Sequence, residues 1–557
     1  MEDSPPGHRP PRIVVIGGVA GGASAAARAR RTDANAEIVM LEKGEYVSFA
    51  NCGLPYHLGG EIAQRSKLLV TTAELFWQRF RIEVRTRHEA TRIERQAKIV
   101  EGIDHATGQT FRIPYDRLIL SLGSEPISPE FMNPPAKNVR HLWTLPDMDA
   151  VLAEIQGAAK VRHAVVIGAG FVGLEVVEQL AAIGIRVTLI ERGNQVLKPL
   201  DPHFAKIVQR ELTNRGVSLH LGVDVAGLDR DGDRVTGVRL SDGTTIATEL
   251  VVVGAGVRPR IRIAADAGLT IGKTGGVLVD DFMRTNDPDI YAVGDMVEYH
   301  HGVLDRRMRI ALAGPANRAG RIAGTHAATG KSQPMGSVLG TAIVRVFGVT
   351  AACTGLSEQA LTAEGIDHHA VIIAAPHHAS YFPGAEPMQL KVVYSPSDGK
   401  ILGAQGVGGQ GVDKRIDVIA TAMHFGGTVY QLAQLDLAYA PPYGSAKDPV
   451  HMAAFAAVND LESSPKVVPP DFDLLGYQVL DVRTGRERTE LPLPGAVAIP
   501  IDELADRWEE LDPTMPTITV CHSGKRAHVA ACWLRGKAFS DVRNLTGGMS
   551  IRSLDPA

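Results

Sequence analysis

The chain has 557 residues, of which 45% are hydrophobic and 22% are charged, and it contains 58 Gly and 33 Pro. This composition is typical of a globular protein and excludes a disordered or collagen-like chain, and the length predicts three or four domains. The 58 basic and 62 acidic residues give a net charge of −4, which argues against nucleic acid or an anionic membrane as the main partner.

The N-terminal segment, the apolar runs and the cysteines indicate where in the cell the protein works. The proline-rich start has no apolar core, so it predicts no secretory signal, and no apolar run approaches the ~20 residues of a membrane-spanning helix. Four widely spaced cysteines form neither a disulfide framework nor a metal-binding pair; they are Cys52, Cys353, Cys521 and Cys532. We therefore expect a reducing, cytoplasmic setting and no metal site.

Two segments of the chain resemble each other. Residues 12–22 and 163–173 each read as an apolar strand, a glycine-rich turn and the start of a helix. Each is followed by a second strand that ends in an acid, Glu42 or Glu191, at the spacing of a dinucleotide-binding βαβ unit. In such a unit, bare backbone N–H groups and the helix N-terminus face a pyrophosphate, and the acid binds a ribose. The candidate cofactor-binding residues are Gly17, Gly18, Gly21, Gly22, Glu42, Gly168, Gly170, Gly173 and Glu191.

The two copies differ in how closely they match the glycine pattern of a dinucleotide-binding turn. The second has the full glycine pattern, whereas Val19 occupies the middle position of the first. Two dinucleotide sites on one chain predict a tightly held FAD and an exchanging NADH or NADPH. Glu191 favours NADH, because a carboxylate repels a 2′-phosphate, but the adjacent Arg192 leaves NADPH open.

Further strands extend this architecture. The segments 115–124 and 250–259 are strand-to-turn runs that we expect to mark chain crossings between the two nucleotide domains. A strand ending in Gly294 and Asp295 places a carboxylate where it either holds the flavin ribityl chain or caps a helix.

The pattern changes after about residue 330. Strands are predicted over 340–347, 370–374 and 388–394, with helices near 356–364 and 413–436, which indicates an α+β domain. A polar, proline-bearing linker is predicted over 458–470, and a small separate domain follows it.

Cys52 is the first candidate catalytic residue. It follows the first acid-bearing strand, in the run Asn-Cys-Gly, where we expect the chain to pass beside the flavin. No second cysteine lies within the next five residues, so the thiol would cycle as a sulfenic acid or as a mixed disulfide with a small thiol. The alternative is a buried, inert cysteine.

Residues 12–457 resemble the flavin-dependent pyridine nucleotide–disulfide oxidoreductases, and among them the single-cysteine coenzyme A disulfide reductases. The runs that carry the resemblance are 17–22, 48–56, 312–318, 378–384 and 439–449. The resemblance implies that Cys52 forms a mixed disulfide with coenzyme A and that the protein is a homodimer. It also implies a coenzyme A pocket lined by Ser24, Arg28, Arg31, Ser48, Asn51, Asn317 and Lys447.

The resemblance further implies that Tyr381 and Tyr439 of the other subunit face the sulfur, with Tyr443 as a rival to Tyr439. From the residues alone, Arg28 and Arg31 share a helix face that would bind phosphate or would simply be a solvated basic face. The peroxidase and water-forming oxidase branch carries a histidine in the first glycine loop. Ala20 stands there in this chain, which favours the coenzyme A disulfide cycle.

The last domain places a cysteine between a strand and a helix. Residues 477–483, 494–500 and 517–520 read as strands, and the loop from Cys521 to Arg526 leads into a helix. Such a loop surrounds a sulfur anion with N–H donors. The domain is similar to rhodanese sulfurtransferases, with 481–483 and 544–549 as landmarks, although a histidine of the usual pattern is missing at 490–496. The loop is one residue too short for a Cys-x5-Arg phosphatase. Cys532 reads as a core residue, and Cys353 has no visible chemical setting.

The sequence therefore predicts an α/β protein. Its parts are an FAD domain (12–125 and 256–330), an NAD(P)H domain (126–255), an α+β dimerisation domain (331–457), the linker (458–470) and an α/β rhodanese domain (471–557). The predicted activity is NAD(P)H-dependent reduction of coenzyme A disulfide, persulfide or polysulfide, with Cys52, Cys521, Tyr381, Tyr439 and Arg526 as catalytic residues. The alternatives are an NADH oxidase or peroxidase that cycles Cys52 sulfenic acid, and a redox-sensing sulfur-delivery protein.

Overall fold

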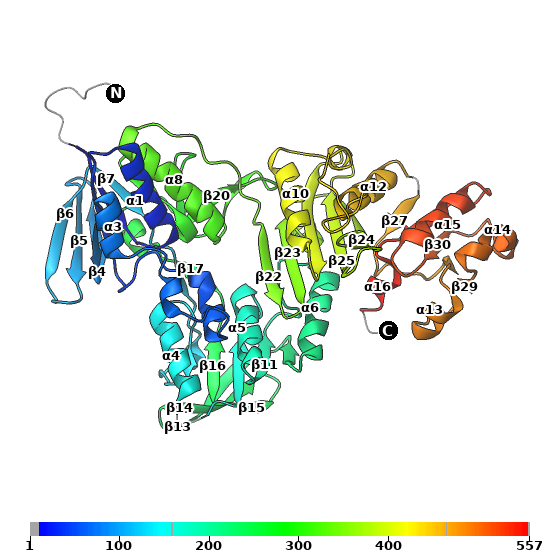
Figure 1. Cartoon of the computed structure of the whole chain (residues 1–557), viewed down its shortest axis with the longest axis horizontal. Coiled ribbons are helices and arrows are strands. Elements are labelled where there is room, and N and C mark those ends of the chain that lie inside the picture. The colour runs from blue at the N-terminus through cyan, green and yellow to red at the C-terminus, as the bar shows by residue number, and fades with distance from the viewer. Residues whose placement is uncertain (1–9, 158–159, 464, 555–557) are drawn as a thin grey trace. The chain divides into compact units, whose positions relative to one another are not determined.

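The computed structural model describes residues 10–157, 160–463 and 465–554 (Figure 1). Within these ranges the chain forms two compact units. The first contains the described residues up to Arg192 together with Val223–Gly340, and the second contains Gly193–Gly222 and the described residues from Thr341 onward. Each unit has its own sheets and its own apolar core.

A parallel five-stranded sheet forms the centre of the first unit. Its central strands are short apolar runs that are buried on both faces, as parallel sheets require, and Ile13, Val14 and Val15 are completely buried. Helices α1 (Ala20–Thr32) and α8 (Ala313–Thr329) pack against each other beside it. The strand order is β19 (Ile290–Ala292), β7 (Arg117–Leu120), β1 (Arg12–Ile16), β2 (Glu37–Glu42) and β3 (Glu83–Thr86).

A second parallel sheet in this unit repeats the pattern. Helix α5 (Phe171–Ala182) connects β10 to β11 as α1 connects β1 to β2. The paired strands run in the order β11 (Arg186–Glu191), β10 (His163–Ile167), β16 (Leu250–Val253) and β9 (Val139–Arg140), and α4 (Leu145–Gln156) follows β9 in the chain. The predicted repeat of two βαβ units is confirmed.

One close backbone contact shapes both βαβ repeats of the first unit. A Cβ built on Gly22 would lie 1.8 Å from the carbonyl oxygen of Gly17, and a Cβ on Gly173 would lie 1.9 Å from that of Gly168. Real Cβ atoms do not approach other atoms so closely, so only glycine lets the helix start this near the end of the strand. The helix N-terminus is thereby held against the turn.

The two segments predicted to mark chain crossings lie side by side. Strands β8 (Ser124–Pro126) and β17 (Val257–Pro259) form an antiparallel pair that connects the two nucleotide-binding regions of the first unit.

Three small antiparallel or mixed sheets complete the unit. They are β4 (His88–Glu94), β5 (Ile99–Asp104) and β6 (Thr110–Pro114); β13 (Val225–Asp231), β14 (Arg234–Leu240) and β15 (Thr245–Ala247); and β18 (Val277–Leu278), β20 (Val297–His301) and β21 (Arg306–Arg309). Its short helices are α2 (Leu54–Leu58), α3 (Ala73–Phe80) and α7 (Arg262–Asp266).

The second unit begins with an antiparallel sheet covered by helices. The strand order is β22 (Ala342–Val346), β23 (Val349–Gly355), β26 (Ile401–Gly408), β25 (Pro387–Tyr394) and β24 (His369–Pro376), which confirms the predicted α+β region. Its helices are α6 (Pro202–Asn214), α9 (Glu358–Ala363), α10 (Val412–His424), α11 (Val429–Leu432) and α12 (Pro449–Leu461). Strand β12 (Ser218–Leu221) follows α6.

The helical region predicted near 413–436 consists of two helices, α10 and α11. Gly426 adopts a φ of +72° after α10 ends, and the side chain of Thr428 then caps α11. A left-handed glycine followed by a capping threonine stops one helix and starts another.

A parallel sheet forms the C-terminal part of the second unit. The strand order is β27 (Lys466–Val468), β31 (Val542–Leu545), β30 (Thr517–Val520), β28 (Gln478–Asp481) and β29 (Val497–Ala498). Helices α13 (Gly485–Glu490), α14 (Leu504–Arg507), α15 (Lys525–Arg535) and α16 (Gly548–Arg552) accompany it. The predicted linker is therefore corrected, because α12 continues to Leu461 and β27 is already a strand of this sheet. No helix in the described ranges is long and apolar enough to cross a membrane.

We expect Gly173→Ala to destabilise the first unit, since its methyl group would collide with the backbone of Gly168. Overpacking of this kind costs about 1–3 kcal/mol. Gly170→Ala is the matched control, because a Cβ there meets no atom within 4 Å. Thermal unfolding of both variants without nucleotide would show the difference, and equal melting temperatures would contradict the role given to this contact.

Candidate functional site

The first glycine turn is tied to the acid at the end of β2. Glu42 accepts hydrogen bonds from the backbone N–H groups of Gly18, at 2.8 Å, and Gly44, at 2.7 Å. Helix α1 starts directly after the turn, and no side chain caps its N-terminus. Free helix N–H groups beside an acid match a pyrophosphate and a ribose, so these residues fit the adenosine diphosphate part of FAD.

The second turn has the same geometry. Glu191 accepts a hydrogen bond of 2.8 Å from the N–H of Ala169, which corresponds to Gly18 in the first copy. Helix α5 also begins without a side-chain cap, and Arg192 is exposed beside the acid. The acids that were predicted from spacing alone therefore occupy equivalent places in the two copies.

Cys52 follows Ser48, whose backbone contacts the first turn. It belongs to a short 3-10 helix, Asn51–Gly53, that precedes α2. The preceding Ser48 donates its N–H to the carbonyl of Gly18 at 2.8 Å and adopts a φ of +47°, so the chain bends sharply around the turn. Asn51 donates its side-chain amide to the carbonyl of Trp143 at 3.3 Å. Cys52 itself is accessible to solvent.

The surroundings of Cys52 favour its protonated form. Partial desolvation raises the pKa of the thiol, and the carboxylates of Glu175 and Asp295 raise it further. Glu175 is on α5, and it accepts a hydrogen bond of 3.2 Å from Tyr56 in the helix that follows Cys52. The thiol therefore lies within electrostatic reach of both nucleotide-binding regions.

Asp295 does not cap a helix. It lies inside the 3-10 helix Gly294–Met296, and its carboxylate accepts a hydrogen bond of 2.9 Å from the hydroxyl of Ser124 on β8. Burial raises the pKa of this carboxyl. A partly desolvated carboxylate beside a hydroxyl suits a ligand that offers hydroxyl donors, as the ribityl chain of a flavin does.

Three of the predicted coenzyme A residues, Ser24, Arg28 and Asn317, lie where α1 meets α8. Ser24 donates to Asn317 at 2.5 Å, and Arg28 donates to Thr325 at 2.9 Å. Arg31 stacks over Phe80 at 5.1 Å instead. A cavity of about 370 Å³ is lined by Arg28, Arg321, Ile322, Thr325, Lys331, Ser332 and Gln333. Three cationic side chains at one small cavity suit an anionic ligand such as a phosphate.

Tyr381 and Tyr439 come from distant parts of the sequence and meet in the second unit. Their hydroxyls form a hydrogen bond of 3.0 Å, and both side chains are exposed. This hydrogen bond raises the pKa of Tyr439. Tyr443 is more exposed than Tyr439, and Lys447 is also exposed in the same loop.

A buried ion pair that sequence reasoning missed holds the tyrosine loops. Arg415 on α10 is 1% exposed and binds Asp448, the cap of α12, through hydrogen bonds of 2.7 and 3.2 Å. The same guanidinium donates to the carbonyl of His377 at 2.6 Å. Ala379 in turn donates to Gly444 at 2.9 Å. The loops that carry Tyr381 and Tyr439 are thereby joined to one fixed charge pair.

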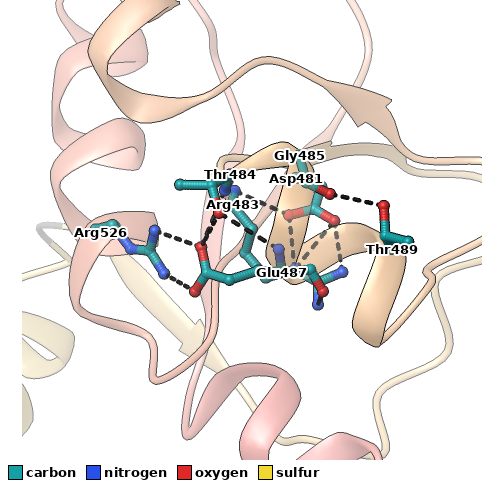
Figure 2. A network of polar contacts seen from close by, with 7 residues as sticks. All are labelled: Asp481, Arg483, Thr484, Gly485, Glu487, Thr489 and Arg526. Atoms are coloured by element: carbon teal, nitrogen blue, oxygen red, sulfur yellow. Dashed lines mark hydrogen bonds and ion pairs between the residues drawn. The ribbon is translucent and has the colours of Figure 1, made fainter.

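Cys521 lies at the end of β30 and is completely buried. Its sulfur accepts a hydrogen bond of 3.1 Å from the N–H of Gly524, at the start of α15. Arg526, on the first turn of α15, forms an ion pair with Glu487, which sequence reasoning missed (Figure 2). Glu487 belongs to a different helix, so no local pattern around Cys521 points to it.

The segment 546–550 supports this loop from the other side. Met549 and Ser550 donate their N–H groups to the carbonyls of Cys521 and His522, at 2.9 and 2.8 Å. A Cβ on Gly548 would lie 2.5 Å from the carbonyl oxygen of Cys521. The backbone of this glycine therefore packs directly against the cysteine loop.

The same segment also contacts the edge strand β24. Thr546 accepts a hydrogen bond from the N–H of Ile372 at 2.7 Å and donates to its carbonyl at 3.0 Å, and Gly547 donates to that carbonyl at 3.1 Å. Asp460, at the end of α12, accepts hydrogen bonds from His369 and Tyr394 on β24 and β25, and from the N–H of Val467 on β27. The C-terminal sheet is therefore fastened to the antiparallel sheet of the second unit.

The other two cysteines, Cys353 and Cys532, differ in burial. Cys353 is buried in β23, and burial raises the pKa of its thiol to about 11. The prediction that Cys532 is a core residue is wrong, because its side chain is exposed, 3.6 Å from His528. The buried face of α15 is formed by Ala527, Ala530, Ala531 and Leu534, and Cys532 falls outside that helical spacing. The described residues hold no metal-binding group of three or more His, Cys, Asp or Glu.

Comparison with known families covers most of the chain. Residues 11–329 match the pyridine nucleotide-disulphide oxidoreductases, residues 341–449 match the dimerisation domain of the same proteins, and residues 470–550 match the rhodanese-like domain. The curated relatives include a coenzyme A disulfide reductase from Staphylococcus aureus strain bovine RF122 / ET3-1. It is 34% identical over 447 residues, which are 80% of this chain and all of the relative.

Two solved structures are similar over nearly the full length. The crystal structure of reduced CoADR-RHD from Bacillus anthracis has a TM-score of 0.94 and 41% identity, and the match covers 98% of each chain. The structure of an NAD-dependent persulfide reductase from A. fulgidus has a TM-score of 0.91 and 36% identity. That match covers 97% of this chain and 99% of the other.

We expect Gly548→Ala to disturb the Cys521 loop, because the methyl group would collide with the carbonyl of Cys521 and because the glycine φ of +59° strains any other residue. Sulfur transfer from thiosulfate to cyanide should fall by about tenfold or more, since small misplacements of reacting groups are costly. Gly485→Ala is the control, because a Cβ there meets only Arg488, at 3.9 Å. Unchanged transfer by Gly548→Ala would contradict this role.

Proposed function

Because the chain belongs to the pyridine nucleotide-disulphide oxidoreductase family, we propose that it uses NADH or NADPH and FAD to reduce coenzyme A disulfide, persulfide or polysulfide. The observation that carries the proposal is the position of Cys52. It is exposed, it follows the segment whose Ser48 contacts the first glycine turn, and it lies within electrostatic reach of Asp295. The other three cysteines belong to the second unit, so Cys52 has no partner thiol in its own unit and requires an external one.

The cofactors have complementary tasks in this proposal. The turn at Gly17–Gly22, Glu42 and Asp295 would hold FAD, and the turn at Gly168–Gly173 with Glu191 would hold the nicotinamide nucleotide. A bound FAD accepts a hydride equivalent from the nicotinamide and supplies two electrons for the cleavage of a disulfide. Glu191 favours NADH, because a carboxylate at that place opposes a 2′-phosphate.

Cys52 would reduce coenzyme A disulfide in two steps. The Cys52 thiolate attacks one sulfur of coenzyme A disulfide, which forms a mixed disulfide and releases one coenzyme A thiolate. Two electrons and a proton cleave the mixed disulfide, free a second coenzyme A thiol and restore the Cys52 thiolate. With a persulfide substrate, the same two-electron balance releases hydrosulfide.

Two features of the chain would bind and orient the substrate. Arg28, Arg321 and Lys331 at the cavity between α1 and α8 would bind the phosphates of coenzyme A, since guanidinium and ammonium groups pair with phosphate. The dimerisation domain supports a homodimer, in which the partner subunit's Tyr381 and Tyr439 would donate a hydrogen bond to the leaving sulfur. In the C-terminal domain, Cys521 would carry sulfane sulfur toward this site.

Cys52→Ser should retain bound flavin and lose coenzyme A persulfide and disulfide turnover to background, because serine cannot form the mixed disulfide. Flavin absorbance and NADH oxidation with each substrate measure the two properties, and Cys532→Ser is the control for an exposed thiol. Wild-type turnover by Cys52→Ser would refute the proposal. Oxygen or peroxide consumption without a disulfide substrate would instead favour the sulfenic acid cycle.

Cys521→Ala should selectively lower the use of thiosulfate or polysulfide and leave coenzyme A disulfide reduction at the wild-type rate. The reason is that only the first two substrates need a sulfur carrier. Steady-state NADH oxidation with the three substrates measures this split. Equal rates with every substrate would show that the C-terminal domain is not a sulfur relay.

A further inference from the structure

The guanidinium of Arg415 joins three segments of the second unit that are distant from one another in the sequence. Arg415 is on α10, which lies beside α12 (Figure 1), and its side chain is 1% exposed. It donates to both carboxylate oxygens of Asp448, at 2.7 and 3.2 Å. It also donates to the carbonyl of His377 at 2.6 Å and to the carbonyl of Gly411 at 3.1 Å. Because the N–H donors of a guanidinium lie in one plane, these bonds together hold the group in one orientation.

The backbone packs tightly around this ion pair. A Cβ built on Gly411 would lie 2.4 Å from the Nη1 atom of Arg415 and 3.3 Å from the Cβ of His377. A Cβ built on Gly444 would lie 3.5 Å from the Oδ2 atom of Asp448 and 3.9 Å from the Nη2 atom of Arg415. The turn that contains Gly444 therefore lies directly against the two charges.

Tyr381 is on a loop that is bonded to this turn. The N–H of Ala379 donates to the carbonyl of Gly444 at 2.9 Å. At the base of the loop, the N–H of His377 donates to the carbonyl of Glu386 at 2.9 Å, and the N–H of Glu386 donates to the Nδ1 atom of His377 at 3.0 Å. The loop that carries Tyr381 is therefore held both at its base and at Ala379.

Tyr439 immediately precedes the turn that ends at the same glycine. The N–H groups of Tyr443 and Gly444 donate to the carbonyl of Ala440, at 2.9 and 3.2 Å. The same segment continues to Asp448, the partner of the buried guanidinium. Both tyrosine-bearing segments are therefore attached to one ion pair.

The meeting of the two tyrosine hydroxyls depends on this attachment. Tyr381 and Tyr439 are 74% and 47% exposed, so little packing holds their rings. Their hydroxyls are nevertheless 3.0 Å apart, although the residues are separated by 58 positions in the chain. A hydroxyl that accepts a hydrogen bond becomes a stronger donor to a third group, so the pair is a better donor than either hydroxyl alone.

We propose that Arg415 is a positioning residue for disulfide reduction, which holds the Tyr381 and Tyr439 hydroxyls together as one hydrogen-bond donor for the leaving sulfur. This inference rests on the proposed reduction of coenzyme A disulfide, in which the pair serves the partner subunit's Cys52. The cysteine thiolate forms a bond to one sulfur of the substrate, and the second sulfur leaves with the electron pair of the broken bond. The tyrosine pair donates a hydrogen bond to this departing thiolate, where negative charge develops.

Lysine at position 415 would keep the charge but lose the geometry. A single ammonium group can pair with the Asp448 carboxylate, yet it lacks the planar fork that also reaches the carbonyls of His377 and Gly411. Arg415→Lys should therefore loosen the tyrosine loops without leaving a buried carboxylate unpaired.

The test compares Arg415→Lys with Arg483→Lys in the full-length holoprotein. Arg483 is 0% exposed, and its guanidinium forms a forked ion pair with Asp481 and donates to the carbonyl of Glu487 (Figure 2). These partners belong to the C-terminal sheet and to α13. The control therefore makes the same substitution at a buried ion pair that does not hold the tyrosine loops.

Arg415→Lys should lower kcat for coenzyme A disulfide by about tenfold, because displaced donors stabilise the leaving sulfur less well. KM should stay within about twofold of the wild-type value, since the cationic groups proposed to bind the phosphates are in the first unit. In a Tyr381→Phe/Tyr439→Phe background the same substitution should cause no further loss, because all three residues act through one donor pair. Arg483→Lys should change neither constant. Steady-state NADH oxidation measures both.

A second measurement reports on the tyrosine pair without catalysis. Photo-oxidation with persulfate as the electron acceptor removes one electron and one proton from each of two neighbouring phenols and joins their rings as dityrosine, while persulfate is reduced to sulfate. Mass spectrometry quantifies the peptides linked through Tyr381 and Tyr439. Arg415→Lys should lower the yield of this link by about threefold, because more mobile loops bring the rings together less often. Arg483→Lys should give the wild-type yield.

A wild-type kcat or a wild-type link yield in Arg415→Lys would overturn the positioning role. A further loss of kcat in the Tyr381→Phe/Tyr439→Phe background, equal losses in Arg483→Lys, or a wild-type protein without the link would overturn it as well. If Arg415→Lys does not fold, the same outcomes apply to Arg415→Met/Asp448→Asn, which leaves no unpaired buried charge. A wild-type protein that does not reduce coenzyme A disulfide would refute the proposed function alone, and the link yield would then decide whether Arg415 positions the pair.

Discussion

The nucleotide-binding half of the molecule depends on one contact between a helix and the strand that precedes it. At Gly22 and again at Gly173, the Cα lies so close to the carbonyl of the turn that a methyl group has no room. This approach holds an uncapped helix N-terminus at the end of each parallel strand. The acid on the next strand then binds the turn through the same backbone position in both copies. Two turns that suit a pyrophosphate thus follow from one local geometry.

In the second unit, buried ion pairs hold loops and a short helix in place. Arg415 and Asp448 join the two tyrosine loops, and Asp481 and Arg483 fix the helix that carries Glu487. Losing one partner of such a pair costs about 3–5 kcal/mol, because the other charge stays buried. The buried ion pairs therefore fix the positions of the tyrosine loops and of the helix that carries Glu487. Short loops without such a pair would be less rigid.

The sequence was most informative where function is encoded locally. The paired βαβ units, the acids at their ends, the crossing segments and the proximity of the Cys521 loop to a helix N-terminus all follow from patterns within about 30 residues of chain. The Arg415–Asp448 and Arg526–Glu487 pairs could not be predicted, since their partners are 33 and 39 residues apart in separate elements. The linker was misjudged for a related reason, because the polar composition of 458–470 conceals the pairing of β27 with β31.

The fastening of the C-terminal sheet restricts the Cys521 loop as well. Residues 546–550 bind Ile372 on β24 through Thr546 and Gly547, and bind the carbonyls of Cys521 and His522 through Met549 and Ser550. One short segment therefore contacts both the antiparallel sheet and the cysteine loop. These hydrogen bonds limit the motion of the Cys521 loop relative to β24, because a shift of the loop would have to carry residues 546–550 with it and break their bonds to Ile372.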